Sequence, residues 1–116
     1  MNEIRKRKVE SLLQAKLAEM ILLQDIKDPR INTFLCVNRV DVSNDLSYGK
    51  VYIGSFQRDS TLEKAVEALN HAVGYIHGVL GKKLPLRSVP HLTFLVDHSI
   101  EDAMSLNRKI DEINAQ

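Results

Sequence analysis

The side chains best suited to catalysis or metal binding are one cysteine and four histidines, and their spacing supports neither role. His71 and His77 are six residues apart in a segment with helical periodicity, so they point to different faces of a helix. His91 and His98 have opposite parity along the chain and would lie on opposite faces of a strand. Cys36 lies in an apolar run, where a thiol is buried and inert. Glycine-rich phosphate loops, Gly-x-Ser-x-Gly elbows and paired-histidine zinc motifs are absent from the sequence, which therefore predicts no enzyme, no cofactor and no metal site.

Lysine and arginine offer a second kind of chemistry, the binding of phosphate groups. Ten such residues are candidate RNA contacts, in one cluster at the start of the chain, one near residue 85, and three single positions. They are Arg5, Lys6, Arg7, Lys8, Arg30, Arg39, Lys50, Lys82, Lys83 and Arg87. For any single one, a solvated surface charge is an equally good interpretation, because exposed lysine and arginine are common. Arg30 has a further alternative role, as the partner of Asp28 or as a cap on helix carbonyls.

The charge is distributed unevenly along the chain, although the net charge is only +1. Fourteen basic and ten acidic residues precede Asp97, whereas two basic and five acidic residues lie from Asp97 onward. A mildly basic body with an acidic end suits a polyanionic partner, but it also suits many ordinary domains. Charge alone therefore favours nucleic-acid binding only weakly.

Length and composition set the broad class. A chain of 116 residues with 44% hydrophobic residues has room for one core, and no apolar run approaches the length that a membrane span needs. The basic N-terminus is followed by an amphipathic pattern and not by the apolar core of a signal peptide. A single cysteine forms no internal disulfide and fits a reducing compartment. We therefore expect a cytoplasmic protein without a membrane segment. We also expect it to act as a monomer and to have no small-molecule substrate.

The first half of the chain predicts a helix and a hairpin. Apolar residues recur at three- and four-residue spacing over residues 4–24, which indicates a helix that must end before Pro29. Residues 40–53 hold two β-branched and aromatic runs around a polar link, which is typical of an antiparallel hairpin. The apolar alternation changes phase at Asn38 and Arg39, which suggests a β-bulge. In the return strand, Lys50 should face solvent where Val51 faces the core.

The second half predicts an interrupted helix and a third strand. Ser60 to Glu63 matches a capping box, and the apolar stripe that follows keeps helical phase as far as Leu80. Three glycines between residues 74 and 81 each cost about 1 kcal/mol relative to alanine, so they favour a bend or a break. Residues 91–96 alternate as a strand, and residues 99–113 have the thin apolar side of a short terminal helix.

These elements predict an α+β fold in the order α-β-β-α(kink)α-β, with a three-stranded sheet and its helices on one face. The order matches the KH-like (type II) topology. We expect one domain over residues 1–97 and an acidic C-terminal segment over residues 98–116.

Five motifs in order along the chain carry a more specific resemblance. They are Asp28-Pro29-Arg30, Val42-Ser43 with Asp45-Leu46, Lys50 to Ile53, Ala72 to Ile76, and Leu86-Arg87 through Val89-Pro90 and Leu92 to Phe94 as far as Asp97. Together they resemble bacterial ribosome-binding factor A over nearly the whole chain. The resemblance implies a non-enzymatic maturation factor, associated with growth at low temperature. It would bind the immature small ribosomal subunit and its precursor RNA, assist late processing and then leave.

The resemblance also implies that a helix kink of the form Ala-x-Gly replaces the Gly-x-x-Gly loop of other KH domains, and Ala72 and Gly74 match it. The run from Gly78 to Gly81 imitates that loop, but the residues between its glycines continue the buried stripe. His77, Ala103 and Ser105 depart from the family pattern, which weakens or removes two possible phosphate contacts. The alternative hypothesis is a KH-like protein-interaction domain that docks through its open sheet face without binding RNA directly.

Overall fold

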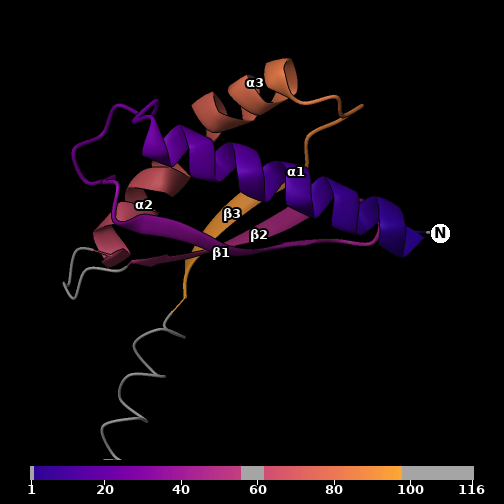
Figure 1. The fold of residues 1–116 in the computed structure, drawn as a ribbon, viewed down its shortest axis with the longest axis horizontal. Coiled ribbons are helices and arrows are strands. Elements are labelled where there is room, and N and C mark those ends of the chain that lie inside the picture. Colours follow the sequence, from indigo (N-terminus) through magenta and orange to yellow (C-terminus); the bar gives the residue numbers. More distant parts are fainter. Residues whose placement is uncertain (1, 56–61, 98–116) are drawn as a thin grey trace, which may run out of the picture.

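The computed structural model describes residues 2–55 and 62–97 and contains helices and strands in the predicted order. The elements are α1 (Asn2–Leu22), β1 (Leu35–Val42), β2 (Tyr48–Ser55), α2 (Leu62–His71), α3 (Val73–Lys83) and β3 (His91–Val96). The three helices lie on one side of a three-stranded sheet (Figure 1). The predicted α+β class and element order are confirmed. The predicted terminal helix and Ser60 of the predicted capping box lie outside the described residues.

The sheet is mixed, with β2 in the centre. β1 and β2 pair antiparallel as the predicted hairpin, whereas β2 and β3 pair parallel because the chain crosses over through α2 and α3. The register of β1 shifts between Val37 and Arg39, which confirms the predicted bulge. Lys50 is exposed and Val51 is fully buried, as the alternation of the return strand predicts.

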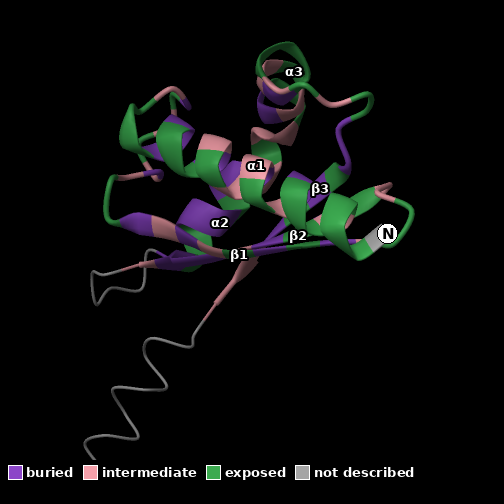
Figure 2. Cartoon of the chain, turned by 45° about the vertical axis from the view of Figure 1, so that its right-hand side comes forward, coloured by how far each residue is buried: buried purple, intermediate pink, exposed green. Residues whose placement is uncertain are grey.

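The core lies between the helices and the sheet. Val9, Leu13, Leu17 and Met20 recur on one face of α1 and are buried against the inner residues of the strands, among them Phe94. In Figure 2, the buried (purple) parts of the chain gather where the helices face the sheet. No charged or polar side chain is buried among the described residues, so the core itself offers no polar chemistry. The prediction that the Cys36 thiol is buried is wrong. Cys36 is only partly buried, and it lies on the sheet face that points away from the helices.

The first helix ends two residues earlier than predicted. Gln24 has a φ of 55°, in the left-handed region, and its N–H donates to the carbonyl of Ile21. The N–H of Asp25 donates to the carbonyl of Met20, which completes a Schellman motif. Glycine usually occupies this left-handed position and marks the end of a helix in the sequence. Glutamine gives no such indication, so the helix was predicted to extend too far.

Both edges of the sheet are covered by polar side chains from the helices. On β1, the Gln14 side chain donates to the carbonyl of Val37 at 2.9 Å, and a Glu10 carboxylate oxygen accepts from the N–H of Val42 at 2.8 Å. On β3, Asn70 of α2 donates to the carbonyl of Phe94 at 3.0 Å and accepts from its N–H at 2.8 Å. These bonds satisfy backbone groups that would otherwise be open to pairing with another chain.

The second helical segment is broken at Ala72, which separates α2 from α3. Ala72 has φ −89° and ψ 5°, and its N–H lies 3.0 Å from the carbonyl of Ala68 and 3.1 Å from that of Leu69. Beyond the break, α3 runs without interruption through Gly78 and Gly81, so these glycines form no exposed binding loop. A Cβ added at Gly74 would have no neighbour within 4 Å among the described residues, so neither packing nor a positive φ requires glycine there.

Candidate nucleic-acid interface

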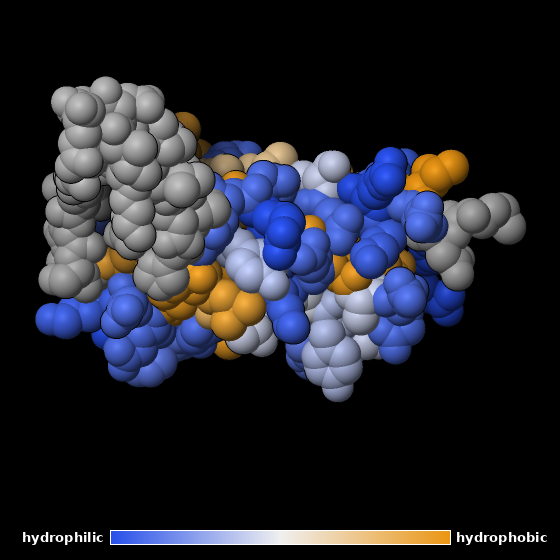
Figure 3. Space-filling view, turned by 90° about the horizontal axis from the view of Figure 1, so that it is seen from below, coloured by the Kyte–Doolittle hydropathy of each residue, from blue (hydrophilic) through white to orange (hydrophobic). Residues whose placement is uncertain are grey.

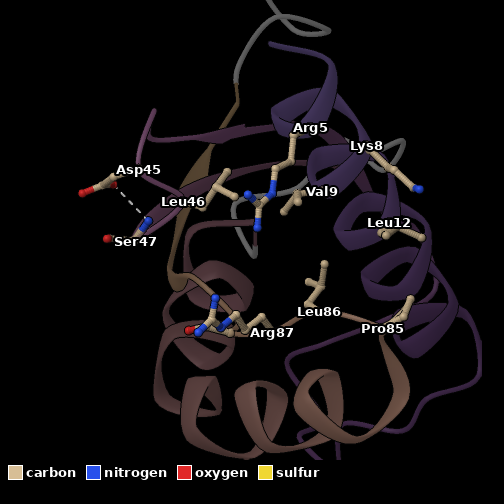
Figure 4. A pocket seen from close by; sticks show the side chains of 11 residues that line it. Arg5, Lys8, Val9, Leu12, Asp45, Leu46, Ser47, Pro85, Leu86 and Arg87 are labelled. Atoms are coloured by element: carbon tan, nitrogen blue, oxygen red, sulfur yellow. Dashed lines mark hydrogen bonds between the residues drawn. The ribbon is translucent and has the colours of Figure 1, made fainter. Parts of the chain in front are cut away.

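A cleft of about 490 Å³ opens between three segments that are far apart in the sequence: the first half of α1, the β1–β2 turn and the loop between α3 and β3. We call it the basic cleft. Its lining residues are Arg5, Lys8, Val9, Leu12, Asp45, Leu46, Ser47, Pro85, Leu86, Arg87 and Ser88. In Figure 4, Arg5, Val9 and Leu46 lie on one side of the cleft, and Arg87 and Leu86 lie on the other.

The periodicity of the helix brings the α1 side of the cleft together. Arg5, Lys8, Val9 and Leu12 stand at positions i, i+3, i+4 and i+7, which share one face of a helix. Val9 is buried and connects the cleft to the core, whereas Arg5 and Lys8 are exposed. Arg7 is also exposed, but it lies about 200° around the helix from Arg5 and does not line the cleft.

The turn side depends on a network of short hydrogen bonds. The Ser43 hydroxyl donates to an Asp45 carboxylate oxygen at 2.8 Å, and its oxygen accepts from the N–H groups of Ser47 and Tyr48. The same oxygen of Asp45 accepts from the Ser47 N–H at 3.1 Å. Bonds from Ser43 and Ser47 to the charged carboxylate hold the pKa of Asp45 below its usual value. The network holds Leu46 at a φ of 62°, an uncommon conformation for a bulky residue, and Leu46 lines the cleft.

The third side begins where α3 ends. The N–H of Leu84 donates to the carbonyl of Leu80, and the extended backbone at Leu84 then leads into Pro85. Leu86 packs against the core, and Arg87 beside it is exposed at the cleft. The packing of Leu86 thus holds the backbone of the loop in place, while the side chain of Arg87 next to it reaches solvent.

The three cations of the cleft are available to an external anion. Among residues 2–55 and 62–97, neither Arg5, Lys8 nor Arg87 forms an ion pair, and Asp45 is the one carboxylate that lines the cleft. Apolar side chains line the cleft between these cations, which lowers the local dielectric and strengthens their attraction for an anion. The arrangement combines phosphate-binding groups with an apolar surface.

Two of the sequence-predicted cations are already engaged within the protein. Arg30 forms two hydrogen bonds to the carboxylate of Asp28, at 3.1 Å and 2.9 Å. This contact lowers the pKa of Asp28 and raises the pKa of Arg30. The structure therefore shows Arg30 in the alternative role, as the partner of Asp28. Arg39 forms an ion pair with Asp41 at 3.0 Å, and its guanidinium lies 4.3 Å from the centre of the Tyr52 ring.

The remaining candidates lie elsewhere. Lys6 and Arg7 are on α1 outside the cleft, Lys50 is on the open sheet face, and Lys82 and Lys83 are exposed at the end of α3. The structure thus brings together only Arg5, Lys8 and Arg87 of the ten predicted residues. The sequence interpretation missed the apolar lining, above all Leu46 and Leu86. Leu46 and Leu86 stand next to predicted turn or loop residues, which is the one signal that could have identified them.

A second cavity of about 380 Å³ lies beside the helix break, between the loop after α1 and the start of α3. Its lining residues are Asp25, Ile26, Lys27, Asp28, Ala68, His71, Ala72 and Tyr75. Ala72 thus lies at a hollow surface, whereas Gly74 does not line it. With two carboxylates against one lysine, this cavity suits an anion less well than the basic cleft does.

Metal-binding clusters and membrane-spanning helices are both absent from the described part of the chain. Within it, no three histidine, cysteine or acidic side chains lie close enough together to hold a metal ion. None of its helices combines the length and the apolar character needed to cross a bilayer. Ala103 and Ser105, two of the departures from the family pattern, lie outside the described residues.

Comparison with known proteins gives one consistent family. A family model described as ribosome-binding factor A matches residues 5–110. The chain is 42% identical over 114 residues to the ribosome-binding factor A of Treponema pallidum (strain Nichols), covering 98% of this chain and 90% of the relative. It is 42% identical over 110 residues to that of Shewanella sediminis, covering 94% and 76%.

Solved structures agree with the sequence comparison. The crystal structure of ribosome-binding factor A from Thermus thermophilus superposes with a TM-score of 0.65 at 33% identity, covering 78% of this chain and 94% of that one. The solution structure of a putative ribosome-binding factor A from Thermotoga maritima gives 0.66 at 34% identity, covering 78% and 85%. A homology model of the T. thermophilus factor, fitted into a cryo-EM map of its complex with the 30S subunit, gives 0.56 at 29% identity, covering 75% and 93%.

Proposed function

Because this chain belongs to the ribosome-binding factor A family, we propose that it binds the immature small ribosomal subunit and its RNA, and that the basic cleft makes this contact. It assists late RNA processing and assembly and is then released. The related factor of T. thermophilus has been fitted into a complex with the 30S subunit, which supports the same partner for this chain. The family consists of ribosome assembly factors of the cytoplasm and not of enzymes. We expect the chain to act as a monomer.

We assign the RNA-binding surface to the basic cleft because three cations that form no ion pair within the described residues converge on this one apolar-lined hollow. Arg5 and Arg87 are more than eighty positions apart in the sequence, yet they line the same hollow. Ribosomal RNA presents a dense array of phosphates, and cations without internal partners gain most from meeting them. Arg30 and Arg39 would first have to give up Asp28 and Asp41, so they contribute less.

Salt dependence distinguishes this proposal from protein docking. Three phosphate contacts predict that affinity falls about twentyfold between roughly 50 and 200 mM salt, because each contact releases bound counterions. The alternative, a KH-like domain that docks on protein through its sheet face, predicts an affinity that changes little over that range. A salt-insensitive association with purified small subunits would therefore contradict phosphate binding.

A matched charge reversal tests the surface itself. Arg5→Glu and Arg87→Glu change the cleft, whereas Arg7→Glu makes the same charge change on α1 outside it. We expect each cleft variant to weaken co-sedimentation with purified small subunits at least tenfold, and Arg7→Glu to weaken it no more than about threefold, because distant charges are screened. Circular dichroism should show the same fold in all three. Equal losses for Arg5→Glu and Arg7→Glu would mean that general charge, and not the cleft, determines binding.

A further inference from the structure

Three aromatic rings form a row at one end of the sheet. Tyr48 opens β2, His91 opens β3 in the position beside it, and His77 projects from α3. The ring centres of Tyr48 and His91 are 5.9 Å apart, and those of His91 and His77 are also 5.9 Å apart. The two imidazoles are nearly parallel, at 16°, whereas the tyrosine is tilted by 38°. We call this set the ring row.

The ring row adds little to the core. Tyr48 is 65% exposed and His91 is exposed, so neither contributes its full apolar area to folding. The open face of the sheet is mainly hydrophilic, with smaller apolar areas (Figure 3). Tyr48 is tilted against the His91 ring and largely exposed, so it presents an aromatic face to a ligand.

Hydrogen bonds fix the backbone that carries two of the rings and the ring of the third. Tyr48 exchanges backbone bonds with Ser43, donating to its hydroxyl oxygen at 3.0 Å and accepting from its N–H at 2.8 Å. The N–H of His91 donates to the carbonyl of Ser47 at 2.9 Å. Nε2 of His77 lies 3.1 Å from the carbonyl of Val89, which only accepts, so Nε2 carries the proton. The backbone of Tyr48 and His91 and the ring of His77 are therefore fixed before any ligand arrives, which reduces the entropy cost of binding.

The ring row is continuous with the basic cleft. Ser47 lines the cleft and is followed at once by Tyr48, and Ser88 lines it three residues before His91. On the same strand and the same face, two residues beyond Tyr48, stands the exposed Lys50. The rings thus lie between the cations of the basic cleft on one side and Lys50 on the sheet face. Cations on both sides of exposed aromatic rings fit a polyanion that also carries exposed aromatic groups.

We propose that the ring row is a stacking platform for unpaired bases of single-stranded RNA, whose phosphates lie along the basic cleft. The inference rests on the proposed function and adds to it that the RNA at this surface is single-stranded. Every base has an aromatic face, so stacking needs no particular sequence. In a double helix those faces are covered by neighbouring base pairs, and the rings could not reach them.

The test measures fluorescence anisotropy with a labelled RNA strand of about twelve nucleotides, alone and annealed to its complement, at low salt. We expect the wild-type protein to bind the single strand more tightly than the duplex. Tyr48→Ala should weaken single-strand binding about 5- to 150-fold, the effect of losing one stacked base. Tyr48→Phe keeps the ring and should stay within about twofold of wild type. His91→Phe should likewise bind better than His91→Ala.

Several outcomes would overturn the platform. They are no binding of the single strand, equal binding of the duplex, and no difference between Tyr48→Ala and Tyr48→Phe. Loss of subunit co-sedimentation by Tyr48→Ala with unchanged RNA anisotropy would show instead that the row contacts a protein. The two proposals fail separately. If Arg5→Glu releases the subunit while Tyr48→Ala leaves RNA binding intact, the basic cleft stands without the platform.

Discussion

Asn70 should stabilise the sheet far more than its position on a helix suggests. Its side chain donates to the carbonyl of Phe94 at 3.0 Å and accepts from the N–H of Phe94 at 2.8 Å. Both backbone groups belong to the edge strand β3, and Phe94 has 1% of its surface exposed. Asn70→Ala removes both bonds and leaves two backbone groups without partners. At about 0.5–1.5 kcal/mol for each bond, the free energy of unfolding should fall by about 1–3 kcal/mol.

Urea unfolding followed by circular dichroism measures this loss, and hydrogen exchange locates it. The Phe94 amide should exchange faster in the variant, because its acceptor is gone. Lys64→Ala is the matched control, since Lys64 is exposed on the same helix and its loss should change stability by no more than about 0.5 kcal/mol. If Asn70→Ala and Lys64→Ala shift the unfolding midpoint equally, the two bonds do not stabilise the edge.

Three further predictions concern the open sheet face and the loop after α1. Gly54→Ala would place a Cβ 2.6 Å from the side-chain nitrogen of Asn38, so urea unfolding should show a loss of about 1–3 kcal/mol. Burial raises the pKa of Cys36, so at pH 8 a disulfide reagent should label it at least tenfold more slowly in the folded than in the urea-unfolded chain. Arg30 lowers the pKa of Asp28, so their contact stabilises the fold above the unfolded pKa of about 3.9 and is lost as pH falls through the folded value. Asp28→Asn should therefore lower Tm at pH 7 but not near pH 2, as a pH series of thermal melts would show.

Each of these predictions has a result that would contradict it. Unchanged stability in Gly54→Ala would mean that the Asn38 amide moves aside without cost, although it also donates to Asp97 at 2.9 Å. Equal labelling of folded and unfolded Cys36 would place the thiol in full contact with solvent. A constant difference in Tm between wild type and Asp28→Asn across the pH series would mean that the charge of the Asp28 carboxylate does not stabilise the fold.

Local pattern was enough to predict the elements and the faces they bury. The phase change at Asn38 located the bulge, and the alternation around Val51 identified the buried side of β2. The end of α1 was placed two residues late because Gln24 takes the left-handed position that glycine usually fills. The contact of Asn70 with β3 joins residues 24 positions apart, and no periodicity in the sequence encodes it.

The candidate site was harder to predict than the fold. A sequence shows which residues are charged, but it does not show which of them the fold brings together in one cleft. Ten cations looked alike, and only tertiary structure separates Arg87, which lines the cleft, from Arg30, which is paired with Asp28. The left-handed conformation of Leu46 depends on hydrogen bonds around it and not on its own preference. The ring row was missed for the same reason, since Tyr48 and His77 come from different elements.

The parallel pairing of β2 with β3 has a consequence for how the protein folds. The antiparallel β1–β2 hairpin closes over a short turn, whereas β3 can pair only after the crossover through α2 and α3 has formed. Contacts of such long sequence separation form slowly, so we expect β3 to dock last. The loop before β3 carries Arg87, and β3 itself begins with His91. A chain that has folded its hairpin but not its last strand therefore lacks one side of the cleft and the middle ring of the row, so this surface is complete only once folding is.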